Sequence, residues 1–170
     1  NAPSLKRSFE LAQGADLIIT IGGASVGDHD LVAPVAAEMG MEQAFYKVAM
    51  RPGKPLMAGR MGDAAMVGLP GNPVSALVCG TVFVAPMVRA MLGLGEVAAP
   101  RRKLPLATDI PANGPREHYM RAVIKGGEVA PEQRQDSSLL SVLASANALM
   151  VRPPHDPART AGTLVDIIAI

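Results

Sequence analysis

The hydrophobic pattern of the first half of the chain predicts strands interleaved with helices. Continuous apolar runs over residues 16–21 and 64–69 are typical of strands that are buried on both faces, as in a parallel sheet covered by helices. Apolar residues at helical spacing recur between these runs and after them. The predicted helices cover residues 4–13, 30–39 and 73–91, and the remaining strands cover residues 42–50 and 56–60. This alternation indicates an α/β layer fold with a mostly parallel sheet.

The pattern changes after a break at residues 93–100. Short alternating segments separated by Pro, Gly and Asn then predict strands, and the hydroxyl-capped segment 137–144 predicts one short helix. The predicted strands cover residues 104–109, 118–124, 148–152 and 163–170. We therefore expect an α/β domain over residues 1–95 and a small, mostly β, barrel-like domain over residues 96–170.

The turn between the strand at 64–69 and the helix at 73–91 is the most informative stretch. Asn72 is a good helix N-cap, and Pro73 falls at the first helical position, where its missing N–H costs nothing. Ser75 adds a hydroxyl to the first turn, whose free amides favour an anion. A capped turn without a ligand is the commoner explanation, so the turn alone does not establish a site.

The composition and net charge of the chain narrow the classes of function that we expect for it. The chain is 49% hydrophobic but only 3% aromatic, and its net charge of +1 argues against a general electrostatic grip on nucleic acid. The longest apolar run contains Pro86 and Arg89, so we predict no membrane span. The single cysteine, Cys79, is expected to pack inside a helix and is compatible with a reducing cytoplasm. The three histidines lack metal-ligand spacing, and no nucleotide-binding P-loop occurs.

Three unusual loops follow predicted strands, at the edge of a parallel sheet where ligands bind. In the loop 22–30, glycines allow backbone amides to approach a phosphate, and Ser25 adds a hydroxyl. Asp28 and Asp30 in this loop are candidate ligands for a hard cation such as Mg²⁺, although helix capping explains them equally well.

The loop 51–55 is basic and stiffened by prolines. It places Lys47, Arg51 and Lys54 close together in the sequence, a grouping that favours an oxyanion or a phosphorylated ligand. A solvated basic strand end is the alternative. If this loop, the loop 22–30 and the loop 69–75 open on one edge, they form a single pocket.

Taken together, these motifs resemble a known family. The segments 22–30 (GGASVGDHD), 50–55 (MRPGKP) and 68–75 (GLPGNPVS) occur in the order and approximate spacing of the molybdopterin molybdenumtransferases, the MoeA and gephyrin E-domain family. The tail is similar to the small C-terminal β domain of that family at residues 116–121, 135–138 and 144–149. The resemblance covers essentially the whole chain.

The resemblance implies a three-layer, MogA-like molybdopterin-binding domain followed by the small β domain. It implies an enzyme that inserts molybdate into adenylated molybdopterin, releases AMP and uses Mg²⁺. It also implies a cytoplasmic homodimer that contacts the molybdopterin adenylyltransferase. Since the chain opens on Asn1 and its sheet lacks a first strand, we expect a fragment of a longer enzyme.

The resemblance also implies roles for individual residues. Asp30, Ser75 and Lys54 become the candidate catalytic residues, and Asp30 with Asp28 becomes the candidate Mg²⁺ site. The candidate residues for binding the cofactor and molybdate are Gly22, Gly23, Ser25, Lys47, Arg51, Pro70, Gly71, Asn72 and Pro73. Two other functions stay open: a molybdopterin adenylyltransferase, which shares the α/β fold, and a non-catalytic, gephyrin-like scaffold or binding module.

Overall fold

The computed structural model describes residues 1–23, 31–95 and 98–170, and the chain folds into two compact units. The first unit consists of Asn1–Val48 and Gly53–Cys79, and the second of Ala49–Pro52 and Gly80–Ile170. The short segment 49–52 therefore belongs to the second unit, although the residues before and after it in the sequence belong to the first. The predicted domain boundary between residues 95 and 96 stays a prediction.

The first unit contains a four-stranded sheet in the order β1-β5-β4-β2. Only β1 and β5 are parallel, and β4 runs antiparallel to both of its neighbours. The strands are β1 (Leu17–Ile21), β2 (Met41–Lys47), β4 (Pro55–Met61) and β5 (Ala64–Leu69). The described sheet is thus mixed rather than mostly parallel, because the tight turn at Gly62 and Asp63 joins β4 and β5 as a hairpin.

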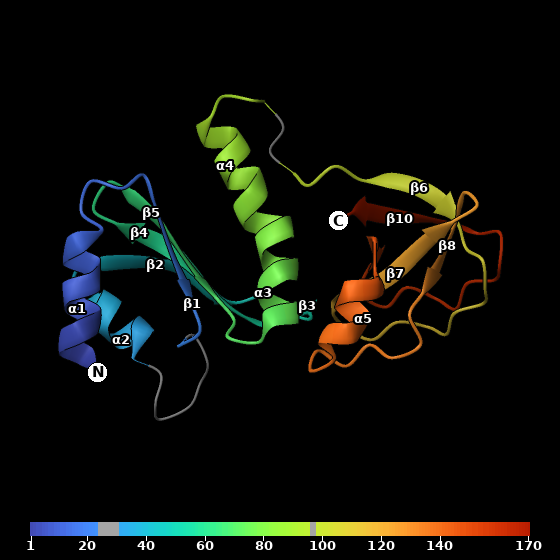
Figure 1. Ribbon diagram of the computed structural model, residues 1–170, viewed down its shortest axis with the longest axis horizontal. Helices are drawn as coiled ribbons and strands as arrows, with labels where there is room; N and C mark the ends of the chain where they lie inside the picture. The colour runs from blue at the N-terminus through green and yellow to red at the C-terminus, as the bar shows by residue number, and fades with distance from the viewer. Residues whose placement is uncertain (24–30, 96–97) are drawn as a thin grey trace. The chain divides into compact units, whose positions relative to one another are not determined.

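Helices cover both faces of this sheet, as the predicted layer fold requires. Figure 1 shows α1 (Ala2–Leu11) and α2 (Val32–Glu38) on one face and α3 (Pro73–Cys79) on the other. Phe9 of α1 and Val35 of α2 pack with Met57 and Met66 of the sheet in one buried cluster. With few aromatic residues, the core is filled mainly by Met, Val, Ile and Ala side chains.

The second unit contains a six-stranded sheet in the order β3-β7-β9-β10-β6, with β8 also paired to β7. One bridge, from Leu106 to Val129, links the chain after β6 to β8, but no continuous ladder closes a barrel in the described residues. The elements are β3 (Met50–Arg51), β6 (Arg102–Pro105), β7 (Glu117–Lys125), β8 (Glu128–Pro131), α5 (Leu140–Ser145), β9 (Ala148–Arg152) and β10 (Leu164–Ala169).

The long helix is interrupted where Pro86 predicts a break. After α3, a π-helical turn, η1 (Gly80–Val84), precedes α4 (Ala85–Met91). Proline has no N–H and crowds the carbonyl four residues earlier, so the turn before Pro86 widens. Pro73–Met91 nevertheless stays one continuous helix, so Pro86 widens its turns without dividing it.

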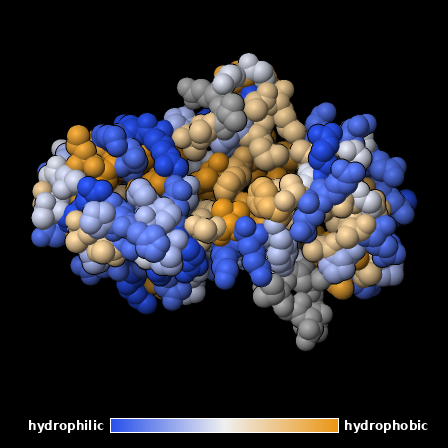
Figure 2. Space-filling view, turned by 180° about the vertical axis from the view of Figure 1, so that it is seen from behind, coloured by the Kyte–Doolittle hydropathy of each residue, from blue (hydrophilic) through white to orange (hydrophobic). Residues whose placement is uncertain are grey.

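The surface of α4 is largely apolar, as the upper middle of Figure 2 shows. Val88, Met91 and Leu92 expose 40%, 48% and 69% of their surface. By length and composition, the helix Pro73–Met91 is the one helix in the described part of the chain that could cross a membrane. Core helices of soluble proteins meet the same criterion, so the prediction of no membrane span stays a prediction.

Candidate functional site

The turn after β5 has the predicted capped geometry. The Asn72 side-chain oxygen accepts a hydrogen bond from the backbone N–H of Ser75 at 3.1 Å, and the Asn72 carbonyl accepts one from Ala76 at 2.8 Å. Pro73 is the first residue of α3. The cap therefore occupies the Ser75 amide, which is no longer available to an anion. Ser75 itself is buried, with 6% of its surface exposed.

The glycine turns after β1 and β5 meet at one edge of the sheet. Gly22 donates a hydrogen bond to the Leu69 carbonyl at 3.0 Å, and a Cβ placed on Gly71 would lie 3.2 Å from the Gly22 Cα. Gly22 and Gly23 both have positive φ angles, 82° and 67°. The first and third loops therefore meet at one edge of the sheet at these glycines, because β1 and β5 are parallel neighbours with adjacent carboxyl ends; this is one part of the condition for a single pocket.

Three predicted residues of the first loop, Ser25, Asp28 and Asp30, lie outside the described residues. Pro70 is buried between β5 and the capped turn. The close approach of two glycine backbones leaves this edge without side-chain bulk, which is the condition under which backbone amides can reach a phosphate group.

The basic loop is divided between the two units. Lys47 and Lys54 belong to the first unit, where Val48 N–H donates to the Lys54 carbonyl at 3.1 Å and closes the loop. Both lysine side chains are exposed, and the Lys47 ammonium lies 5.7 Å from the Tyr46 ring centre. Arg51 belongs to the second unit, because β3 pairs with β7. The peptide bond between Arg51 and Pro52 is cis.

Cys79 is a packing residue, as predicted. It is fully buried, and its thiol donates to the Gly53 carbonyl at 3.9 Å. Burial raises the pKa of this thiol to about 12, so it stays protonated and unreactive near neutral pH.

The most unusual side chain in the second unit is Arg121, on β7. It is fully buried, yet only its Nη2 has a partner, the Asp136 carbonyl at 3.1 Å. Its Nε and Nη1 are buried without a hydrogen-bond partner among the described residues. Burial lowers the pKa of Arg121, the positive charge of Arg51 lowers it further, and Asp136 opposes both. A buried guanidinium with unused N–H groups is costly, and an oxyanion is the ligand that it fits best.

The backbone around Arg121 is held firmly. Its N–H donates to the Gln135 side-chain oxygen at 3.0 Å, and its carbonyl accepts from the Gln135 side-chain nitrogen at 2.8 Å. The same nitrogen also donates to the Glu132 carbonyl at 2.7 Å. These bonds hold the segment before α5 against β7 at the backbone of Arg121.

Sequence reasoning placed Arg121 and Gln135 only within family-like segments and assigned neither a role. The sequence does carry a sign that Arg121 is unusual. It lies between Met120 and Ala122, and most of the other buried residues of this strand are apolar. A lone arginine in an alternating strand is usually interpreted as facing solvent, so its burial emerges only from the three-dimensional structure.

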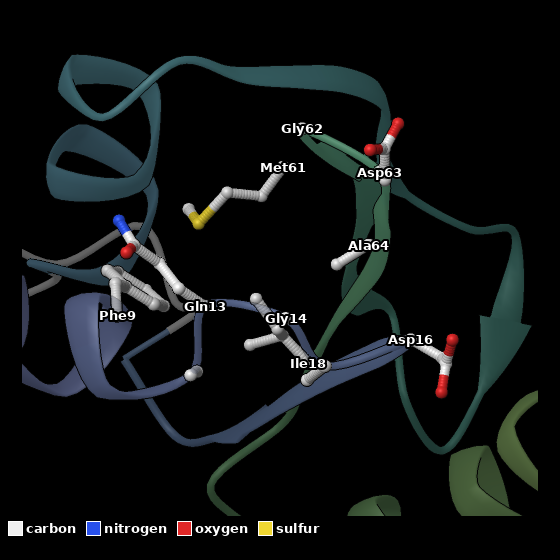
Figure 3. A pocket seen from close by; sticks show the side chains of 11 residues that line it. Phe9, Gln13, Gly14, Asp16, Ile18, Met61, Gly62, Asp63 and Ala64 are labelled. Carbon is white, nitrogen blue, oxygen red and sulfur yellow. The ribbon is translucent and has the colours of Figure 1, made fainter.

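The pocket in Figure 3 lies in the first unit. Its volume is about 410 Å³, and it is bounded by the end of α1, the start of β1 and the β4–β5 turn. Gly22 follows the opposite end of β1. Phe9, Ile18 and Met61 give the pocket apolar walls, whereas the carboxylates of Asp16 and Asp63 point away from them (Figure 3). Among the residues that the structure describes, no sequence-predicted site residue lines it.

Comparisons with known proteins match both units. Residues 1–90 match the family model described as "Probable molybdopterin binding domain", and residues 103–170 match "MoeA C-terminal region (domain IV)". The molybdopterin molybdenumtransferase 2 of Mycobacterium tuberculosis is 36% identical over 165 residues, which cover 92% of this chain and 40% of that protein. The molybdopterin molybdenumtransferase of Bacillus subtilis is 30% identical over 174 residues, which cover 98% of this chain and 40% of that protein.

A solved structure supports the fold. The molybdopterin biosynthesis MoeA protein from Pyrococcus horikoshii aligns with a TM-score of 0.79 at 24% identity and covers 99% of this chain. The alignment covers 41% of that structure. The chain thus spans about two fifths of the length of the relatives that it matches.

Proposed function

Because this chain belongs to the molybdopterin-binding family of the MoeA type, we propose that it acts in molybdenum cofactor biosynthesis as part of a molybdopterin molybdenumtransferase. The proposed reaction inserts molybdate into adenylated molybdopterin and releases AMP. The observation that carries the proposal is the occurrence, in one chain and in this order, of the molybdopterin-binding domain and the MoeA C-terminal region. A molybdopterin adenylyltransferase is disfavoured, since the curated relatives with this domain pair are named molybdenumtransferases.

The two units supply different chemistry in this proposal. In the first unit, the glycine turns at residues 22–23 and 71 leave room for the phosphate of the pterin, although the Gly22 N–H itself is bonded to the Leu69 carbonyl, and Lys47 and Lys54 add positive charge. Ser75, in the first turn of α3, is the hydroxyl residue nearest in the sequence to the turn at Gly71. In the second unit, Arg121 offers unused N–H groups to molybdate, whose tetrahedral oxygens accept hydrogen bonds as phosphate oxygens do. Electrostatic stabilisation of the anions, rather than a protein nucleophile, is the proposed contribution to the reaction.

The described residues, 1–23, 31–95 and 98–170, contain no group of three or more His, Cys, Asp or Glu side chains that could hold a metal ion. The candidate ligands for Mg²⁺, Asp28 and Asp30, lie outside those residues, and we assign no step to the ion.

Three further proposals rest on the family resemblance alone. They are a homodimer, contact with the molybdopterin adenylyltransferase, and a cytoplasmic location. A gephyrin-like scaffold is the alternative that would use the same fold without the reaction.

The oxyanion part of the proposal is tested by calorimetric titration of molybdate into the purified chain. Saturable binding is expected in the unmodified protein, none in Arg121→Ala, and unchanged binding in Arg102→Ala. Arg102 is a matched control because it is an exposed arginine of the same unit. Binding that survives in Arg121→Ala contradicts the assignment.

The reaction itself is tested by incubating the protein with adenylated molybdopterin and measuring AMP by chromatography. We expect molybdate to stimulate AMP release. AMP release that does not respond to molybdate, or consumption of ATP in its place, would overturn the proposed activity.

A further inference from the structure

The unused donors of Arg121 are closed to solvent in this structure. The residue is 0% exposed, and its Nε and Nη1 are buried without a hydrogen-bond partner among the described residues. To bind them, an oxyanion must bring an oxygen to about 2.9 Å from these nitrogens, which it cannot do without displacing the atoms that cover them. Anion binding at Arg121 therefore requires part of the protein to move.

The hydrogen bonds of Arg121 lead to one surface loop, residues 132–146, which we call the 132–146 loop. The Arg121 N–H donates to the Gln135 side-chain oxygen at 3.0 Å, and its carbonyl accepts from the Gln135 side-chain nitrogen at 2.8 Å and from the Glu132 N–H at 2.9 Å. Its Nη2 donates to the Asp136 carbonyl at 3.1 Å. Helix α5, near the end of this loop, lies beside β7 (Figure 1). The loop thus contacts Arg121 through both its backbone and its guanidinium.

The ends of the 132–146 loop are joined, whereas its middle is attached through polar contacts. The Ser145 hydroxyl donates to the Glu132 carboxylate at 2.9 Å and closes the base of the loop. No residue of this range, all of which the structure describes, is buried, and Leu140 at the start of α5 is 54% exposed. A loop with joined ends and little buried apolar surface can open without unfolding the sheet beneath it, and Gln135 anchors its middle to β7.

The closed loop also supplies groups that compete with an anion. The Asp136 carbonyl occupies Nη2 of Arg121, and the negative charge of Asp136 raises the pKa of that arginine. An oxyanion needs the same guanidinium and is repelled by the Asp136 carboxylate. The closed loop and a bound anion therefore exclude each other.

We propose that the 132–146 loop is an autoinhibitory lid, which covers Arg121 when closed and must open before an oxyanion binds there. The inference rests on the proposed function, which places an oxyanion at Arg121. Gln135 is then a positioning residue that sets the fraction of molecules with an open loop and does not contact the anion. The apparent dissociation constant equals the intrinsic one divided by that fraction, so a weaker anchor gives tighter binding. Each hydrogen bond that is lost changes the opening equilibrium by about fivefold.

The first test is calorimetric titration of molybdate into the unmodified chain and two loop variants. Gln135→Ala loses both bonds to the Arg121 backbone and is expected to bind molybdate at least about tenfold more tightly. Gln133→Ala is the matched control and should bind like the unmodified protein, because Gln133 is an exposed glutamine of the same loop. If Gln135 were only a structural residue, its loss would lower stability without raising affinity.

The second test needs no substitution. Hydrogen exchange of the unmodified protein, measured by mass spectrometry, should become faster in residues 132–139 when molybdate is saturating, because the open loop loses its bonds to β7. A ligand that binds to a closed, preformed site slows exchange around it instead. Slower or unchanged exchange in this range with molybdate bound therefore overturns the lid.

The outcomes separate the lid from the proposed function. Molybdate binding that is lost in Arg121→Ala but has the same or a lower affinity in Gln135→Ala overturns the lid and leaves the proposed function intact. Binding that is detected only in Gln135→Ala supports the lid, since the anchored loop then stays closed in the unmodified protein. Absence of binding in every variant overturns the oxyanion site and, with it, the lid.

Discussion

The substitution Arg121→Met tests whether this arginine is retained for binding at a cost in stability. Methionine has a similar length and no polar hydrogen, so it fills the site without unpaired donors. The change loses the bond from Nη2 to the Asp136 carbonyl, worth about 1.5–3 kcal/mol for a charged donor. It also removes two buried nitrogen donors without a partner, each costing about 1–3 kcal/mol, together with the repulsion from Arg51. We therefore expect a net stabilisation of about 1–3 kcal/mol.

The assay is urea unfolding near pH 7 in buffers free of phosphate and sulfate, with Arg152→Met as the contrasting variant. Arg152 is as buried as Arg121 but is bonded to the Asp156 carboxylate and to the Pro111 and Pro157 carbonyls. Its loss leaves these groups unpaired and is expected to destabilise the second unit by about 3–5 kcal/mol. Added molybdate should stabilise the unmodified protein and leave Arg121→Met unchanged. If Arg121→Met is destabilised as strongly as Arg152→Met, Arg121 is a structural residue and the reasoning fails.

Three further predictions concern the turns and the buried ion pairs. Asn72→Ala should lower stability by about 1 kcal/mol in thermal unfolding because the helix loses its N-cap, whereas Asn72→Asp should stay near the unmodified value. Gly71→Ala should destabilise more than Gly114→Ala, since neither glycine has a positive φ but only a Cβ at residue 71 would lie 3.2 Å from another backbone, that of Gly22; equal effects would contradict the close approach. The pKa of Asp156 is lowered below 3.8, because hydrogen bonds from the arginines outweigh the effect of burial, so its stabilisation is present above about pH 4 and is lost as pH falls through the folded-state value. The melting temperature should therefore decline in acid, and Asp156→Asn should weaken that decline.

Much of the first unit could be predicted from local patterns. The Asn72 cap and the buried strand β5 depend on residues close together in the sequence, and the structure confirms both, while Pro86 appears as a π-helical turn in a continuous helix. The sheet direction was predicted less well. Alternation of helices and strands suggested mostly parallel pairing, but the two-residue turn at Gly62 imposes a hairpin between β4 and β5.

The second unit was harder to predict because its important contacts join distant residues. The short strand β3 was read as the end of β2, yet Arg51 pairs with His118, far along the chain. Strand β8 was missed, since four residues ending in proline give little signal. The candidate site shows the same limit. The glycines at residues 22 and 71 were predicted to meet because strand ends share an edge, whereas the burial of Arg121 depends on the segment that Gln135 holds over it.

Two buried arginines on the neighbouring strands β7 and β9 show how a structural arginine differs from one that is available to a ligand. Arg152 and Arg121 are both less than 3% exposed, so burial alone does not distinguish them. The N–H groups of Arg152 donate to the Asp156 carboxylate and to the backbone carbonyls of Pro111 and Pro157, and these bonds explain its presence without a ligand. In Arg121 one guanidinium nitrogen donates a hydrogen bond and two have no partner among the described residues, and the positive charge of Arg51 lowers its pKa further. No requirement of folding explains that arrangement. A buried charge that the fold leaves uncompensated is better explained by a ligand of opposite charge than by stability.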